Sequence, residues 1–282
     1  MLSYRHGFHA GNHADVLKHM VLCLLMRHFN LKDKPYSVLD THSASGIYNL
    51  SDAFSKKNEE YKTGVSKILN NKKLQEIVPE YYKILHSLNK DSNLNYYMGS
   101  PFIETSLSRD CDVINLIDLH NAEIEALHKN FSYDNRVHIH KRDGLQALSA
   151  LLPLTPRRSL ILIDPSYEIK SDYYNLVKAL KIALTKQSTA TIAIWYPVLS
   201  RLSDESKKLV QDIRRLNYPL LQAELIVDTQ QEDFGMCGSG MLILNYPFNL
   251  EEDLNKLLGE LYQSLKNSKD AKAKLKVLVQ KA

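Results

Sequence analysis

The sequence predicts an α/β protein with a Rossmann-like sheet that is parallel except for an antiparallel terminal hairpin. Short aliphatic runs alternate with longer amphipathic stretches through most of the 282 residues, and such alternation is typical of a doubly wound sheet. Four of the expected strands also end at or just before an aspartate, namely Asp40, Asp118, Asp143 and Asp164. Ligands in these folds bind at the carboxyl ends of the strands, so we expect a binding site there.

The first expected element is a helix that begins after Asn12, a good N-cap, with Asp15 three residues on as in a capping box. Its apolar face recurs at helical spacing through Val16, Leu17, Met20, Val21, Leu24 and Leu25. The expected strands are Tyr36–Asp40, Val113–Ile117, Val137–His140, Ser159–Ile163, Thr191–Trp195, Leu220–Val227 and Met241–Leu244. We expect the last two to form the antiparallel hairpin at one edge of the sheet.

The interval between the first two strands is unusually long. It covers about 70 residues, from His42 to Asp112, whereas a crossover usually needs a dozen or a few dozen. Residues 56–89 are rich in Lys, Glu, Leu and Tyr and have a helical pattern. We therefore expect one Rossmann-like domain over residues 1–282 that contains an inserted helical subdomain at 50–98.

Composition favours a soluble protein. Its hydrophobic content of 44% and charged content of 24% are ordinary for a globular domain. No apolar run reaches the ~18 residues that cross a bilayer, and the polar start at residues 4–9 is unlike a signal peptide. We expect a cytoplasmic protein with no membrane partner.

Cysteine and histidine spacing argue against a disulfide framework and against a bound metal. Cys23, Cys111 and Cys237 lie far apart without a Cys-x-x-Cys pair, and we expect each of them to be buried as a small apolar side chain. His9 and His13 have the i, i+4 spacing of metal ligands, but no further ligand completes a set. We expect no metal site.

The net charge of +4 is uneven, because lysines crowd the C-terminus. They are Lys256, Lys266, Lys269, Lys272, Lys274, Lys276 and Lys281. Such a run suits a polyanionic partner, and a solvated amphipathic helix or a frayed tail are the alternative interpretations.

The most informative motif is Asp164-Pro165-Ser166-Tyr167, directly after the aliphatic strand. The Asp164 carboxylate and the Pro165 carbonyl can accept hydrogen bonds from the two N–H groups of an exocyclic amine. Tyr167 can stack on the ring that carries this amine. A strand-ending turn without chemistry is the alternative interpretation, because Asp-Pro is a common turn opener.

The other strand ends suit a nucleoside cofactor. Asp118 follows the second strand, where an acid accepts hydrogen bonds from ribose hydroxyls, and Asp143-Gly144 follows the third, where an acid can meet the amine of an adenine. The turn 40–46 lies at the nucleoside position but keeps only Gly46 of the usual glycines, so an ordinary β-to-α turn is the alternative there.

A polar cluster, Tyr4, His6, Lys18 and His19, lies before and inside the first helix. We expect it to form a wall against a bound nucleotide. The alternative is a capping segment that exposes solvated imidazoles.

The Asp-Pro-x-Tyr motif resembles that of amino-methyltransferases that modify adenine N6, except that Ser166 replaces a second proline. Other stretches resemble one family in particular, the 23S ribosomal RNA adenine-N6 methyltransferases. They are Met1–His6, Phe8–His19, Leu39–His42, Gly99–Pro101, Leu160–Pro165 and Trp195–Val198. The resemblance implies a class I methyltransferase that uses S-adenosylmethionine to methylate adenine 2030 of 23S RNA.

Carried over by position, the resemblance implies a catalytic Asp164 and a substrate-contacting Tyr4. The implied cofactor residues are His19, His42, Ser100, Asp118, Asp143, Gly144 and Asp164. We expect the substrate residues to be Tyr4, His6, Lys18, Pro165 and Tyr167. The chain departs from the family pattern at Ser166, at Ala44, where a glycine is usual, and at Asp118, where the resemblance implies a conservative change from Glu.

Two alternative functions stay open at this point. A nicotinamide-dependent oxidoreductase would also use Asp118 on a ribose, although Gly-x-Gly-x-x-Gly is missing. A non-catalytic RNA-binding relative is compatible with Ser166 and Ala44. For the methyltransferase we expect a monomer whose partner is 23S RNA, protein-free or at an early stage of assembly.

Overall fold

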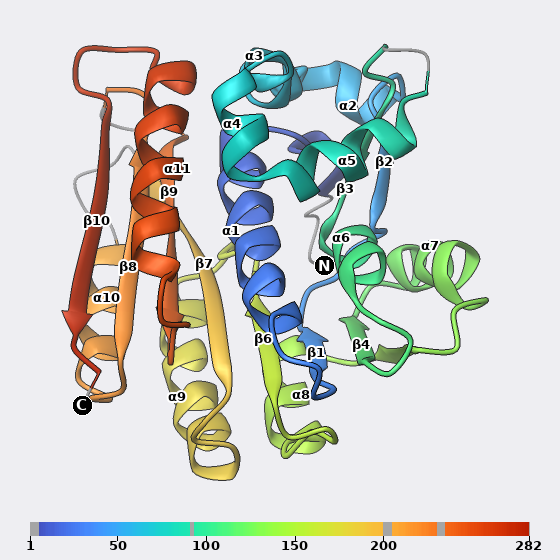
Figure 1. The fold of residues 1–282 in the computed structure, drawn as a ribbon, viewed down its shortest axis with the longest axis vertical. Coiled ribbons are helices and arrows are strands. Elements are labelled where there is room, and N and C mark those ends of the chain that lie inside the picture. The colour runs from blue at the N-terminus through green and yellow to red at the C-terminus, as the bar shows by residue number, and fades with distance from the viewer. Residues whose placement is uncertain (1–5, 91–92, 200–204, 230–234, 282) are drawn as a thin grey trace.

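The computed structural model describes residues 6–90, 93–199, 205–229 and 235–281, with the side chains of 53, 54 and 56 left aside. In this part of the chain, eight strands form one sheet in the order β10-β8-β9-β7-β6-β1-β4-β5 (Figure 1). The parallel strands are β1 (Ser37–Asp40), β4 (Val113–Asp118), β5 (Val137–Lys141), β6 (Ser159–Ile163) and β7 (Thr191–Leu199). The antiparallel strands are β8 (Leu220–Ile226), β9 (Met236–Leu244) and β10 (Lys272–Val279).

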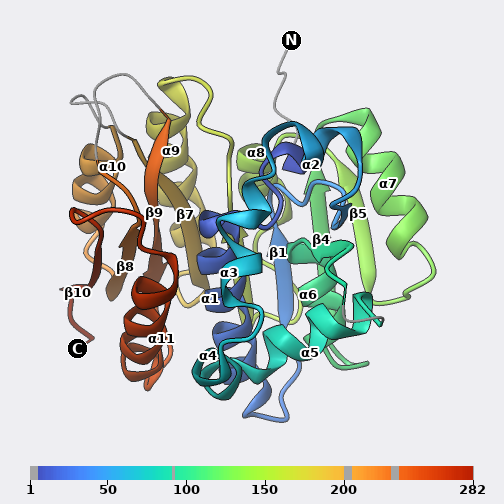
Figure 2. The same ribbon diagram turned by 90° about the horizontal axis from the view of Figure 1, so that it is seen from above.

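Helices cover both faces of the sheet (Figure 2). One face carries α1 (His13–Asn30), α6 (Ser100–Leu107), α7 (Asn121–Phe131) and α11 (Leu250–Leu265). The other carries α8 (Gly144–Leu151), α9 (Ser171–Lys186) and α10 (Glu205–Arg214). Strand β6 shows why the central strands are continuously apolar: Leu160 and Leu162 join the first core, whereas Ile161 and Ile163 join the second.

The predicted fold class and the seven predicted strands are confirmed, but the edge of the sheet differs from the prediction. Strands β8 and β9 do pair as antiparallel neighbours, and β10 then pairs with β8 and forms the edge. The C-terminal lysines therefore lie partly on a strand, where Lys272 and Lys276 are exposed. Neither a helix nor a frayed tail forms over Lys272–Val279, because apolar residues alternate with these lysines at the period of a strand.

The long interval after β1 contains a short antiparallel pair and a layer of helices. Strands β2 (Ile47–Asn49) and β3 (Tyr96–Met98) flank α2 (Ala53–Asn58), the 3-10 turn η2 (Glu60–Lys62), α3 (Val65–Ile68), α4 (Lys72–Ile77) and α5 (Pro79–Leu88). Of these helices, α5 packs on α1, whereas α3 and α4 pack on α11. Their buried side chains, such as Val65, Leu74 and Tyr81, belong to the same core as α1.

Local details support the first helix and correct one cysteine. Asn12 caps α1 by accepting hydrogen bonds from the backbone N–H groups of Ala14 and Asp15, both at 2.9 Å. Cys23 and Cys237 are buried as expected, whereas Cys111 is exposed because it lies in the turn that enters β4. Among the described residues, no helix combines the length and the apolarity that crossing a membrane requires.

Candidate active site

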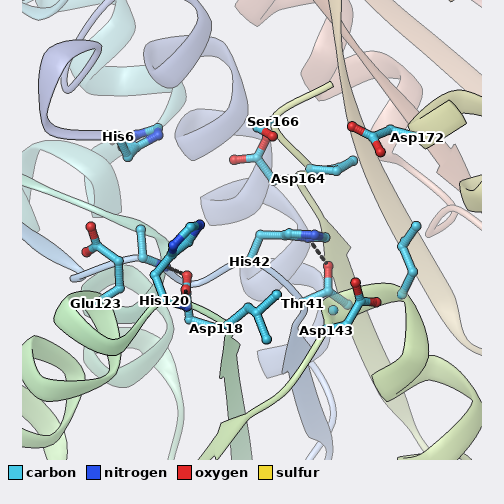
Figure 3. A pocket seen from close by; sticks show the side chains of 15 residues that line it. His6, Thr41, His42, Asp118, His120, Glu123, Asp143, Asp164, Ser166 and Asp172 are labelled. Atoms are coloured by element: carbon cyan, nitrogen blue, oxygen red, sulfur yellow. Dashed lines mark hydrogen bonds between the residues drawn. The ribbon is translucent and has the colours of Figure 1, made fainter. Parts of the chain in front are cut away.

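Two adjoining pockets open where the parallel strands end. The first, here called the carboxylate pocket (Figure 3), is lined by residues that include His42, Asp118, Leu119, Asp143, Gly144 and Pro165. The second, here called the aromatic pocket, is lined by residues that include Lys18, Tyr167, Tyr173, Trp195 and Pro197. The two pockets share His6, Asp164 and Ser166. Asp164 therefore lies at their junction.

In the carboxylate pocket, backbone groups fix the Asp118 side chain. Its two oxygens accept hydrogen bonds from the N–H groups of Ala44, at 3.0 Å, and His120, at 2.8 Å. Each carboxylate oxygen has a second lone pair, which can accept a hydrogen bond from a ribose hydroxyl. Leu119 is 47% exposed beside it and offers an apolar surface to a flat ring.

The next strand supplies a second acid and a close backbone approach. Asp143 caps α8 by accepting from the N–H of Gln146 at 2.8 Å, and it lines the pocket. A Cβ at Gly144 would lie 2.1 Å from the carbonyl oxygen of Thr41, so only glycine fits there. The loops after β1 and β5 are therefore packed closely enough to cradle a nucleoside.

The loop after β1 is organised by Asp40, which is buried. Its carboxylate accepts from the Ser100 hydroxyl at 2.6 Å and from the His42 N–H at 3.1 Å. Burial raises the pKa of Asp40 to about 6, although these two hydrogen bonds favour its charged form. Asp40 and Ser100 are buried and hold the backbone of the loop in place through these hydrogen bonds. Of the three residues, His42 lines the pocket.

The departure at Ala44 places a side chain on strained backbone. Ala44 has φ 47° and Gly46 has φ 75°, both in the left-handed region that favours glycine. A Cβ at Gly46 would meet the Phe131 ring at 2.6 Å, whereas Ala44 lines the pocket and donates to Asp118. Within this loop, Gly46 is the position where packing against Phe131 requires a glycine, and the chain has a glycine there.

An ion pair holds Asp164 from one side. The Lys18 ammonium lies 2.5 Å from Asp164 Oδ2 and 2.9 Å from Asp15 Oδ1. Lys18 is 4% exposed, so the structure does not present it as a surface contact for RNA phosphates. It instead orients the carboxylate of the Asp-Pro-x-Tyr motif at the junction of the two pockets.

The aromatic pocket is built around Tyr167. Its hydroxyl donates to the carbonyl oxygen of Trp195 at 2.7 Å, and its ring centroid lies 4.5 Å from that of Tyr173 and 6.0 Å from that of Trp195. Burial raises the pKa of the Tyr167 hydroxyl well above its ordinary value, so this hydroxyl stays a donor. The pocket offers aromatic surface to a flat base next to Asp164.

Of the remaining expected site residues, His6 lines the pockets and His19 does not. His19 is fully buried in α1, where its Nδ1 lies 3.0 Å from the Tyr97 hydroxyl, and burial lowers its pKa to about 3. His6 lines both pockets and its Nε2 lies 3.0 Å from Asp15 Oδ2. Tyr4 lies outside the described residues.

Sequence reasoning did not place Asp15 or Trp195 beside the pockets. Asp15 was interpreted as part of a helix cap and Trp195 as the last residue of a strand. Asp15 in fact contacts Lys18 and His6, and Trp195 lines the aromatic pocket. The i, i+3 spacing of Asp15 and Lys18 on one helix face was the available signal.

The fold is that of a class I methyltransferase. The sheet is mostly parallel, the antiparallel strands β9 and β8 follow β7 in the strand order, and the carboxylate pocket lies at the ends of the parallel strands. The chain matches a family model described as "RsmJ: Ribosomal RNA large subunit methyltransferase D, RlmJ" over residues 33–279. It therefore belongs to the RlmJ family of ribosomal RNA large subunit methyltransferases. The resemblance inferred from the sequence motifs is confirmed.

Three known proteins illustrate this membership. The chain is 39% identical over 266 residues to the Ribosomal RNA large subunit methyltransferase J of Escherichia coli K12, covering 94% of both. It is 41% identical over 267 residues to the protein of the same name from Haemophilus influenzae, again covering 94% of both. A crystal structure of a Legionella pneumophila protein superposes with a TM-score of 0.87 and 33% identity, covering 95% of this chain and 98% of that one.

Proposed function

We propose that this enzyme transfers a methyl group from S-adenosylmethionine to N6 of one adenine of 23S ribosomal RNA, adenine 2030 by resemblance. The observation that carries the proposal is the position of Asp164 between the carboxylate pocket and the aromatic pocket. The printed names of the two relatives, large subunit methyltransferases, support the choice of RNA. The enzyme acts as a cytoplasmic monomer.

The carboxylate pocket fits S-adenosylmethionine. Asp118 would accept hydrogen bonds from the ribose hydroxyls, Asp143 would accept one from the adenine amine, and Leu119 would pack against the purine. Gly144 lets the backbone approach closely, and His42 lines the same cavity. His19 and Ser100 do not line this pocket, and we assign them indirect roles. His19 contacts Tyr97, and Ser100 donates to Asp40. When bound, the cofactor supplies an electrophilic methyl group.

Asp164 and Pro165 activate the target amine. The Asp164 carboxylate and the Pro165 carbonyl accept hydrogen bonds from the two N6–H groups, which raises electron density on a nitrogen whose lone pair is delocalised into the ring. One N6 proton leaves after the methyl group has bonded to N6. Lys18 contacts Oδ2 of Asp164, and we assign the base to Oδ1, the oxygen that Lys18 does not contact. The same carboxylate stabilises the positive charge that develops on N6 during transfer.

The aromatic pocket replaces the stacking that the base loses. A protein cannot reach N6 inside a stacked helix, so the adenine must be splayed out. Tyr167, fixed by Trp195 and Tyr173, provides the face on which it stacks. His6 lies at the same junction and forms part of the substrate wall, whereas Tyr4 is assigned to the substrate by resemblance alone.

The decisive experiment compares the wild-type enzyme with Asp164→Ala on 23S RNA from a strain that lacks the enzyme, with the modified nucleotide mapped by mass. We expect one N6-methyladenine with the wild type and a loss of about 10²- to 10³-fold in the variant, as for removal of one preorganised polar group. Circular dichroism and thermal unfolding check that the variant is folded. Methylation of another atom, or none with a wild type that binds RNA, would refute the proposal and favour a non-catalytic relative.

A further inference from the structure

Asp15 is the most connected buried carboxylate near the two pockets. It is 3% exposed and lies in the first turn of α1. Its Oδ2 accepts from the Gly11 N–H at 3.0 Å and lies 3.0 Å from His6 Nε2. Its Oδ1 lies 2.9 Å from the Lys18 ammonium and 3.9 Å from His19 Nε2.

The surroundings keep Asp15 ionised. Burial alone would raise its pKa, but the neighbouring His6 and Lys18 outweigh burial and hold the pKa well below its ordinary value. Lys18 thus lies between two carboxylates, those of Asp15 and Asp164. Lys18 and the two carboxylates by themselves carry one more negative charge than positive charge, and His6 adds a positive charge beside Asp15 only when it is protonated.

We infer that Asp15 is a positioning residue for methyl transfer, which acts through Lys18 to hold the Asp164 carboxylate in place and to keep it a strong hydrogen-bond acceptor. The inference rests on the proposed function, because it assigns the acceptor role to Asp164. Asp15 itself lines the aromatic pocket but contacts neither reacting atom in this scheme.

The physical reason is the sharing of one cation between two anions. Lys18 alone with Asp164 would form a fully compensated pair, whose carboxylate is a weaker acceptor for the N6 hydrogens. With Asp15 present, Lys18 is anchored from its own helix and its charge is divided. Asp164 then retains excess negative charge where positive charge develops on the amine.

A purely structural role for Asp15 makes a different prediction. Its hydrogen bond from Gly11 closes the turn before α1, so its loss would lower stability without a specific effect on catalysis. Asp112 offers a matched control, because it is 2% exposed, pairs with Arg109 at 3.0 Å and accepts the backbone N–H groups of Tyr36 and Arg109. It lines neither pocket.

The test measures kcat, KM for S-adenosylmethionine and thermal stability for Asp15→Asn, Asp15→Glu and Asp112→Asn on 23S RNA, at a temperature where all are folded. We expect Asp15→Asn to lower kcat at least 10-fold with KM changed less than threefold, and Asp15→Glu to recover part of the loss. Asp112→Asn should lower the melting temperature but keep kcat within threefold.

A double variant completes the test. Because Asp15 acts through Lys18, the combined loss in Asp15→Asn with Lys18→Met should fall short of the product of the two single losses. Multiplicative losses, a kcat for Asp15→Asn within threefold of wild type, or no recovery with Asp15→Glu would overturn the inference. Failure of the wild type to methylate RNA would instead overturn the proposed function, so the two failures are distinguishable.

Discussion

At the scale of single residues, buried ionisable groups set both the chemistry and the pH response. Lys18 is charged and buried because two carboxylates surround it, which offsets the cost of removing an ammonium from water. His19 lies on the same helix but has only the Tyr97 hydroxyl at Nδ1 and a carboxylate oxygen 3.9 Å from Nε2. Burial therefore decides its pKa, which falls to about 3.

This pKa predicts a contribution of His19 to acid unfolding. Between pH 6.5 and about 3 the unfolded chain binds a proton at this residue that the folded chain does not, so stability is lost as the pH falls through this window, by at most about 1.4 kcal/mol per pH unit. His19→Gln should flatten that dependence. Urea unfolding of both proteins at pH 7, 6 and 5 is the measurement, and parallel curves would contradict the prediction.

At the scale of elements, the loop from β6 to α9 tolerates the departure from the family motif. Ser166 lines both pockets, whereas the strained residue is Tyr167, with φ 51°. The Tyr167 hydroxyl and ring contacts hold that conformation. The loop is therefore fixed by its aromatic side chain as well as by Pro165.

From this we predict that Ser166→Pro is neutral or mildly activating. A second proline fixes one more φ angle and lowers the conformational entropy of the unfolded chain. Asp164 keeps its contact with Lys18 in the variant. Steady-state rates on 23S RNA test it, with cofactor affinity as the control. A fall of 10-fold or more would show that the Ser166 N–H or hydroxyl is needed.

Strand β10 protects the edge of the sheet. Exposed lysines on an edge strand oppose pairing with another chain, and Lys272 and Lys276 are exposed there. Lys274 instead lies 3.3 Å from Glu224. Four strand spacings of ~4.8 Å separate β10 from β6, which leads to Asp164.

We therefore predict that replacing Lys272 and Lys276 by Gln promotes association of the protein and leaves the salt dependence of RNA binding unchanged. Light scattering over a range of protein concentrations measures the first effect, and filter binding at several salt concentrations the second. A shallower salt slope in the variant would show that β10 contacts RNA phosphates.

At the scale of the whole molecule, the site exists because the fold brings three distant segments together. Helix α1 supplies Lys18, the end of β6 supplies Asp164, and β7 supplies Trp195. Of the helices between β2 and β3, α5 packs on α1, and α3, α4 and α5 share its core. A folded body of this size needs open space around a splayed-out base.

We therefore predict that protein-free or partly assembled 23S RNA is a better substrate than the mature subunit. Affinity should fall steeply with salt, because phosphate contacts supply much of it. Methylation of purified 23S RNA, intact large subunits and short hairpins under the same conditions is the test. Activity confined to intact subunits would contradict the prediction.

The sequence by itself determined the fold class, the seven strands first expected and the motif at Asp164, because these depend on local periodicity and on residues adjacent in the chain. It also placed Asp118 and Asp143 after the ends of two strands. Because these strands are parallel, both residues lie at the same edge of the sheet. The sequence did not predict strand β10. Its lysines alternate with apolar residues, a pattern that an edge strand tolerates, but the lysines were interpreted only as a run of charge.

Only the tertiary structure decided what Lys18 does. The residue lies 146 positions before Asp164, and nothing in the local pattern distinguishes a lysine that binds phosphate in solvent from one that is buried between two carboxylates. The same holds for Asp15, His19 and Trp195, whose surroundings come from other elements. Burial and ion pairing depend on which segments the fold packs together, and that depends on the whole chain.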